Sequence, residues 1–220
     1  MKIIHLDHPI SDLQRAELLF DGDLLVYTLR ESMIELIEFT SLMLKKHLGD
    51  LAPQSAQYKL DKASFLEATC NAQAEFCRNK QARQLFFNVL SECGVDLEQC
   101  YYDHFPLRVV PYAKQHLGAH RAAIGHHRDT WGSNIHCQQN WWAPIFDLTE
   151  QRTIAFYPDY WSKPVTNTTS TWNFDEYLAQ RQTVEPERSI EYPSAPKVTQ
   201  TVDNSNIVKV VISPGDVLNF

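Results

Sequence analysis

The apolar and polar positions of the first 95 residues repeat with the period of amphipathic helices. Three such runs predict helices over residues 31–48, 61–78 and 81–93. Gly49 and Gly94 stand where the first and the third of these helices would end, and Asp61 is placed to cap the second. Ahead of them, residues 24–27 follow an Asp-Gly turn and predict a short strand. The first part of the chain is therefore expected to be mainly helical.

The pattern changes after residue 95, where short runs rich in β-branched and aromatic residues alternate with Pro, Gly, Asn and Asp. The runs predicted as strands are 101–102, 107–110, 138–146, 153–157, 207–212 and 217–220. A single later helix is predicted over residues 173–182. Helices followed by many short strands indicate a mainly β fold, a β-sandwich or jelly roll supported by N-terminal helices. Without an internal repeat or a long linker, residues 1–220 are expected to form one domain, mainly helical over 1–95 and with a jelly-roll core over 96–220.

Charge and composition exclude several classes of partner. The net charge of −7, without a run of Lys or Arg, leaves no footprint for nucleic acid or for an anionic membrane. No stretch reaches the roughly 20 apolar residues that span a bilayer. The N-terminal residues meet charge too early for a signal peptide. Five Cys, an odd number without CxxC spacing, are expected to be reduced thiols in a cytoplasmic protein.

The most specific chemical feature is the tripeptide His127-Arg128-Asp129. If these residues form a strand, the first and third side chains project from one face, so that an imidazole and a carboxylate point into the same pocket. With one His from a distant strand they would complete a facial triad of two His and one carboxylate. Such a triad holds Fe(II) and leaves positions open for a co-substrate and O2. By itself, an H-x-D tripeptide is more often a turn or a surface pair than a metal site.

The surroundings of this tripeptide favour the metal interpretation. Gly125 permits a close approach of the backbone just before it, and a small polar and a large aromatic residue, Thr130 and Trp131, follow it. Residues 138–145 then alternate amide and indole side chains. Amides inside a strand are costly to bury without a partner, so they indicate a polar ligand in a lined cavity. The alternative for the indoles is that they fill the core.

Several segments between residues 105 and 220 resemble the bacterial Fe(II)/2-oxoglutarate oxygenases of the phytanoyl-CoA dioxygenase-like superfamily. These segments are 127–131, 139–144, 155–158, 164–165 with the Asn/Thr/Ser-rich turn before Trp172, and 214–218. The resemblance implies a double-stranded β-helix, which is a cupin-like jelly roll, with Fe(II) bound by His127 and Asp129 and with 2-oxoglutarate as co-substrate. It also implies that Asn140 and Trp142 share one face of a strand and line the cofactor cavity.

The function implied by the resemblance is the oxidation of a small organic molecule by O2, with 2-oxoglutarate converted to succinate and CO2. Related iron halogenases have Gly or Ala at the position of Asp129, where chloride then binds. The carboxylate therefore indicates hydroxylation, desaturation or cyclisation. Arg108, a cation in a predicted strand, is a candidate partner for a carboxylate of the co-substrate or substrate, and is otherwise a solvated strand residue. The expected partners are the small-molecule substrate and O2.

The chain departs from the superfamily in one respect, because it has no His after His136. The superfamily takes its second His ligand, and the Arg that pairs with 2-oxoglutarate, from late strands. We therefore expect a fold that is incomplete at the C-terminus and a chain that is an inactive fragment of an oxygenase. His120 or His136 can substitute for the missing ligand in principle. The competing hypothesis is a catalytically silent jelly-roll module that binds a small polar ligand without turnover.

Overall fold

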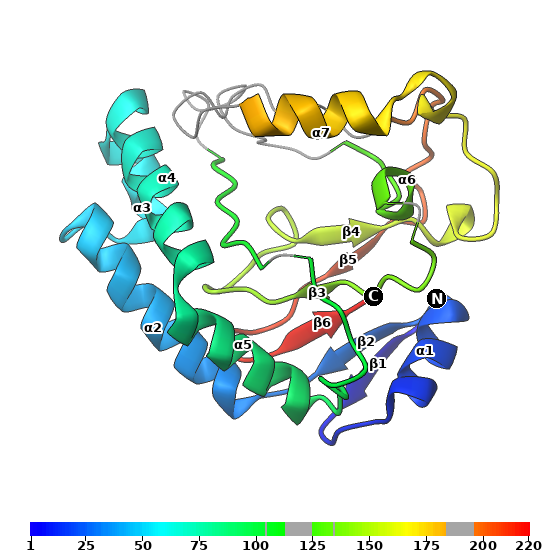
Figure 1. Ribbon diagram of the computed structural model, residues 1–220, viewed down its shortest axis with the longest axis horizontal. Coiled ribbons are helices and arrows are strands. Elements are labelled where there is room, and N and C mark those ends of the chain that lie inside the picture. The colour runs from blue at the N-terminus through cyan, green and yellow to red at the C-terminus, as the bar shows by residue number, and fades with distance from the viewer. Residues whose placement is uncertain (104, 113–124, 134, 184–195) are drawn as a thin grey trace.

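The computed structural model describes residues 1–103, 105–112, 125–133, 135–183 and 196–220, with only the backbone described for residues 180–183. The fold is mixed α/β, with 42% helix and 11% strand. Its strands form a four-stranded sheet of order β1-β2-β6-β3 and a two-stranded sheet of β4 and β5 (Figure 1). The predicted mainly β fold, a jelly roll or double-stranded β-helix, is therefore wrong for the residues that the structure describes.

The four-stranded sheet joins strands from both ends of the chain. It comprises β1 (Ile3–Leu6), β2 (Leu24–Tyr27), β6 (Val217–Asn219) and β3 (Trp141–Trp142). β1 runs parallel to β2, and β6 is antiparallel to both β2 and β3. The apolar run of β2 is buried along its whole length, as is typical of a strand covered on both faces. In the second sheet, β4 (Ile154–Phe156) and β5 (Val208–Val210) pair antiparallel.

Most of the described helices precede residue 95, and those between residues 31 and 92 gather along one side of the sheets. The α-helices are α1 (Asp12–Phe20), α2 (Glu31–Leu48), α3 (Pro53–Lys59), α4 (Lys62–Arg78), α5 (Lys80–Glu92), α6 (Thr130–Ser133) and α7 (Phe174–Thr183). Two 3-10 turns are η2 (Pro158–Tyr160) and η3 (Thr169–Thr171). Figure 1 shows α2, α3, α4 and α5 together, whereas α7 lies apart from them beyond β4. Across the described ranges, no helix is long and apolar enough to cross a membrane.

The predicted helices are confirmed. α2 begins and ends at the predicted residues, and Gly49 follows it with φ of +63°. Asp61 caps α4, because its carboxylate accepts a hydrogen bond from the backbone N–H of Ser64 at 3.0 Å. The strand β2 and the helix α7 are confirmed as well. The pattern did not predict β1, α1 or α3, although α1 begins with a capping box between Ser11 and Gln14.

Several of the strands predicted beyond residue 95 are absent or shorter than expected. Residues 107–110 lie against the helices instead, where the carbonyl of Leu107 accepts a hydrogen bond from the Gln73 side chain at 2.9 Å. The ring of Phe105 stacks on Phe86 with centroids 4.0 Å apart. Of the longest predicted run, only β3 is a strand. Because strand preference depends on what a side chain packs against, the β-branched residues of this region did not decide its structure.

Two hydrophobic cores lie on opposite faces of the four-stranded sheet. The first lies between the sheet and the helices α2, α4 and α5, and includes Leu25, Tyr27 and Val217. The second lies between the two sheets and includes Val26 and Leu218. Neighbouring residues of β6 therefore point into different cores, as the pleat of a strand requires. β3 is an edge strand of the larger sheet. The segment with the amide side chains directly precedes it, so these amides lie at that edge.

Candidate functional site

His127 and Asp129 converge on each other, as predicted. The Nε2 atom of His127 lies 3.1 Å from Oδ1 of Asp129, and the two side chains are 35% and 38% exposed. The strand that was expected to bring them together is wrong. Both residues are exposed and lie in a loop that leads into α6, where the backbone N–H of Gly132 donates to the carbonyl of Asp129 at 3.3 Å. An exposed loop is a setting that counts against a metal site. A turn, and not the pleat of a strand, makes the two side chains meet.

The residues that alternate with this pair hold the loop to the segment 157–163. The ring of His126 contacts that of Tyr157 edge-on, and its Nε2 lies 2.9 Å from the phenol oxygen. The guanidinium of Arg128 donates to the carbonyl of Lys163 at 2.6 Å. The loop is thus fixed by its two outward side chains, and the imidazole and carboxylate between them face each other.

The imidazole of His127 is oriented by a backbone carbonyl. Its Nδ1 lies 2.8 Å from the carbonyl oxygen of Gly125, so that Nδ1 is the donor and Nε2 is directed at Asp129. The hydrogen bond with Asp129 raises the pKa of His127 above its ordinary value, against burial and the positive charge of Arg108. A Cβ atom on Gly125 would meet nothing within 4 Å. The close approach predicted at this glycine is therefore wrong, and the site uses its carbonyl.

The carboxylate of Asp129 is held from its other side by a series of amides. The Nδ2 of Asn140 donates to Oδ2 of Asp129 at 2.7 Å. Asn140 in turn accepts a hydrogen bond from Gln138 at 2.8 Å, and the Ser133 hydroxyl donates to Gln138 at 2.8 Å. The backbone of Asn140 pairs with Phe220 through two hydrogen bonds of 2.7 and 3.0 Å. The amides were expected to face a polar ligand, and their partners are side chains of the protein instead. Ser133 was missed, because nothing in the sequence distinguishes it from other loop serines.

The remaining predicted site residues lie in different settings. Trp142 pairs with Leu218 in the sheet and packs half-buried against the second core, so its ring at least partly fills the core. Arg108 is exposed, and its charge acts on the imidazole of the site. His136 is exposed. His120 lies outside the described residues.

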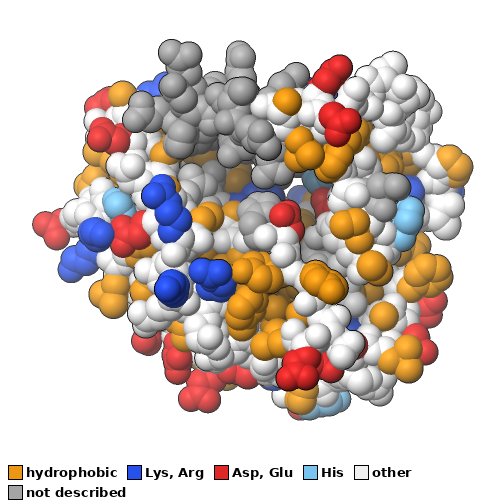
Figure 2. Space-filling view, in the orientation of Figure 1, with side chains coloured by type: hydrophobic (Ala, Val, Ile, Leu, Met, Phe, Trp, Pro, Cys, Tyr) orange, Lys and Arg blue, Asp and Glu red, His pale blue; other side chains and the backbone are white. Residues whose placement is uncertain are grey.

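The donor set matches, in type of side chain, two of the three protein ligands of an Fe(II) triad. An imidazole nitrogen and a carboxylate oxygen face each other, and each group is hydrogen-bonded through its far atom, as metal ligands usually are. Within the described ranges, no group of three or more His, Cys, Asp or Glu side chains is placed to hold a metal ion. Figure 2 shows the molecule hollowed beneath α7 and next to α6, with cationic and His side chains visible inside.

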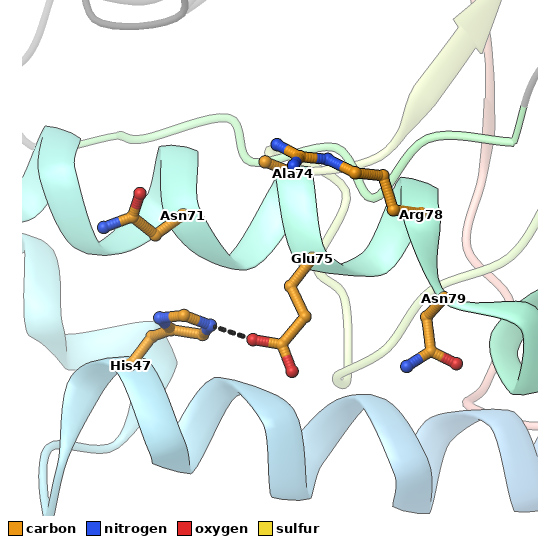
Figure 3. A pocket seen from close by; sticks show the side chains of 6 residues that line it. All are labelled: His47, Asn71, Ala74, Glu75, Arg78 and Asn79. Carbon is orange, nitrogen blue, oxygen red and sulfur yellow. Dashed lines mark hydrogen bonds and ion pairs between the residues drawn. The ribbon is translucent and has the colours of Figure 1, made fainter.

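A second polar hollow lies between α2 and α4 and has a volume of about 450 Å³ (Figure 3). At its edge, the Glu75 carboxylate lies 2.8 Å from Nζ of Lys46 and 2.7 Å from Nε2 of His47. Figure 3 shows His47 and Glu75 pointing toward each other, with Arg78 extending away from them. The charge of Glu75 is thus compensated within the protein. We interpret this cluster as a connection between two helices and not as a binding site.

No family model, no curated protein and no solved structure matches this chain. The arrangement around His127 and Asp129 is therefore the feature from which a function can be inferred.

Proposed function

We propose that this chain carries a non-haem Fe(II) site and acts as a 2-oxoglutarate-dependent dioxygenase on a small organic molecule. The observation that carries the proposal is the pair formed by His127 Nε2 and Asp129 Oδ1, which lie 3.1 Å apart and are each oriented from behind by a hydrogen bond. Ligands whose far atoms are fixed in this way are characteristic of metal sites. The resemblance of the surrounding segments to the Fe(II)/2-oxoglutarate oxygenases supports iron as the metal.

The hydrogen bonds decide which atoms of the pair would bind the metal. His127 would bind through Nε2, because its Nδ1 donates to the carbonyl of Gly125. Asp129 would bind through Oδ1, because Oδ2 accepts the hydrogen bond from Asn140. When bound, Fe(II) supplies the redox chemistry by which O2 converts 2-oxoglutarate to succinate and CO2 and oxidises a C–H bond of the substrate.

Three further residues are proposed to act around the metal. Arg108 would pair with a carboxylate of 2-oxoglutarate or substrate, and its charge already acts on His127. Asn140 and Trp142 would line the co-substrate side of the site, with Asn140 also holding the carboxylate of Asp129. By the resemblance, this carboxylate corresponds to the position that chloride takes in related halogenases. The expected products are therefore hydroxylated, desaturated or cyclised, and not chlorinated.

The cytoplasm is the compartment that we propose for this protein. All five cysteines are free thiols, and Cys77, Cys100 and Cys137 are exposed. Exposed thiols persist in a reducing compartment. Labelling of the thiols in cells, followed by mass spectrometry, should find them reduced; a disulfide between any two would contradict the cytoplasmic assignment.

A binding module without turnover is the second candidate. One observation favours it, namely that the described part of the chain offers no third metal-ligating side chain beside His127 and Asp129. Such a module would bind a small polar ligand at the same place and would form no succinate.

Metal binding tests the pair directly. Anaerobic titration calorimetry with Co(II) is expected to show one bound ion, and His127→Ala or Asp129→Asn should weaken binding about tenfold or more. His8→Ala is the matched control, because it removes an exposed imidazole that is also paired with an aspartate, Asp7, in another part of the chain. It should keep the wild-type affinity. Equal losses in the two His variants, or no binding by the wild-type chain, would remove the metal site.

Turnover separates the enzyme from the binding module. The sequence leads us to expect an inactive chain; formation of succinate with Fe(II), ascorbate and 2-oxoglutarate, abolished in His127→Ala, would overturn that expectation and support the oxygenase. Ala substitutions of His120 and His136 test for a third ligand. The substitution that weakens Co(II) binding marks the His that binds the metal. Binding of 2-oxoglutarate without succinate formation would support the binding module.

A further inference from the structure

Arg15 in α1 is a fully buried cation. Its hydrogen-bond partners come from several parts of the chain and are Ile10, Asp12, Tyr27, Cys93 and Gln139. A buried guanidinium is costly unless its donors are paired. Here the pairing is provided by two backbone carbonyls, a carboxylate, a phenol and an amide, so Arg15 joins the N-terminal segment to the end of α5 and to the residues before β3.

Two contacts of Arg15 lie on either side of Asn140 in the sequence. The Nε of Arg15 donates to Oε1 of Gln139 at 3.1 Å. The guanidinium carbon of Arg15 lies 5.5 Å from the centre of the Trp141 ring, which also stacks on Tyr27 at 5.8 Å. In extended backbone, neighbouring side chains point to opposite faces. Contacts that hold the side chains of Gln139 and Trp141 on one face of the segment therefore also hold the side chain of Asn140 on the opposite face.

We propose that Arg15 is a positioning residue for the metal site. It holds the segment 139–141 so that the amide of Asn140 meets the carboxylate of Asp129, 2.7 Å away. The inference rests on the proposed function, because the orientation of this carboxylate matters only if it binds a metal. The backbone of Asn140 is also paired with Phe220, so the segment keeps one attachment when Arg15 is removed. A role in folding alone would lower stability and leave metal affinity unchanged.

The test is a double-mutant cycle on the full chain, with Co(II) as the probe. Arg15→Met and Asn140→Ala are each expected to raise the Co(II) dissociation constant about tenfold, the lower end of what loss of a ligand's hydrogen-bond partner costs. The double variant should bind no more weakly than Asn140→Ala alone, because Arg15 acts through that amide. Arg152→Met is the matched control. It also removes an Arg stacked on an aromatic ring, with its guanidinium carbon 4.8 Å from the centre of the Tyr112 ring, and should leave the affinity unchanged.

The outcomes separate the two proposals. If the wild-type chain binds no Co(II), the proposed function fails and the inference falls with it. If the wild-type chain binds and Arg15→Met binds equally well, whatever its melting temperature, the inference fails and the metal site stands. Additive losses in the double variant would also overturn it, because Arg15 would then act by another route. If Arg15→Met does not fold, Gln139→Leu tests the same connection with Arg15 in place; weaker Co(II) binding supports the inference and unchanged binding overturns it.

Discussion

Replacing Gly94 by Ala should destabilise the protein through the backbone of Ile10. Gly94 ends α5 with φ of +87°, and a Cβ built there would lie 2.3 Å from the carbonyl oxygen of Ile10. Ordinary contact begins near 3.4 Å, so the Ile10 carbonyl would have to retreat by about 1 Å. That carbonyl accepts a hydrogen bond from the buried Arg15 at 3.2 Å. Gly94→Ala therefore combines backbone strain with damage to the pairing of a buried charge.

The magnitude follows from comparison with Gly49→Ala. Gly49 also has a positive φ, but a Cβ there would meet nothing within 4 Å. Both variants carry the conformational cost of about 1–3 kcal/mol for a side chain at positive φ. Only Gly94→Ala adds the weakened hydrogen bond to Arg15, and a hydrogen bond to a charged group contributes about 1.5–3 kcal/mol. Complete loss of this hydrogen bond would lower the free energy of unfolding of Gly94→Ala by about 1.5–3 kcal/mol more than that of Gly49→Ala.

Urea unfolding followed by circular dichroism measures both variants on the same scale. The comparison is repeated in the Arg15→Met background, where the hydrogen bond to Ile10 is absent. The excess cost of Gly94→Ala over Gly49→Ala should shrink there, because the two changes share a partner. Equal destabilisation by the two glycine substitutions in the wild-type background would refute the packing of Ile10 against the end of α5.

Three further predictions concern the cores, a surface carboxylate and the thiols. Leu218→Ala, at a fully buried position of β6, should cost about 2–5 kcal/mol of unfolding free energy in urea, and a loss under 1 kcal/mol would contradict its burial. Hydrogen bonds, chiefly from Lys46, lower the pKa of Glu75, so the stabilisation is present above the ordinary pKa near 4.5 and is lost as pH falls through the folded value. Glu75→Gln should therefore melt below the wild-type protein at pH 7, and the gap should narrow as pH falls below 4.5; a gap that is as wide in acid as at pH 7 would refute this. Burial raises the pKa of Cys93 to about 12, so iodoacetamide at pH 8 should modify the exposed Cys100 in the folded protein and leave Cys93 intact by mass spectrometry.

The elements that could be predicted are those whose signal is local. α2 is 18 residues long with a continuous apolar face, and α4 carries its own cap at Asp61, so neighbours in the sequence suffice to define both. The short strands depend on partners instead. Residues 107–110 have side chains that favour a strand. The nearby Phe105 packs against the rings of Phe76 and Phe86, so this segment lies on the helices instead. β1 is four residues long and has too little pattern to be recognised.

Part of the candidate site was predicted correctly, but from a local structure, a strand, that these residues do not form. The convergence of His127 and Asp129 is confirmed, yet it comes from a turn whose geometry the sequence did not reveal. The amide of Asn140 was expected to face a polar ligand, and its partner is instead the carboxylate of Asp129. Arg15 could not be singled out, because an Arg on an amphipathic helix is usually solvated and its burial depends on residues more than 70 positions away.

The alternation of anchoring and ligand residues in the loop has a thermodynamic consequence. His126 and Arg128 hold this loop to the segment 157–163, while Gly125 and Asn140 fix the two groups between them. Immobilising a side chain costs up to about 2 kcal/mol of entropy, and here that ordering accompanies the folding of the chain. An arriving ion therefore meets prearranged donors, in contrast to domains that fold only around their metal. The rate at which a protease cleaves this loop should therefore be the same with and without metal, because the loop already has its ordered conformation before the ion binds.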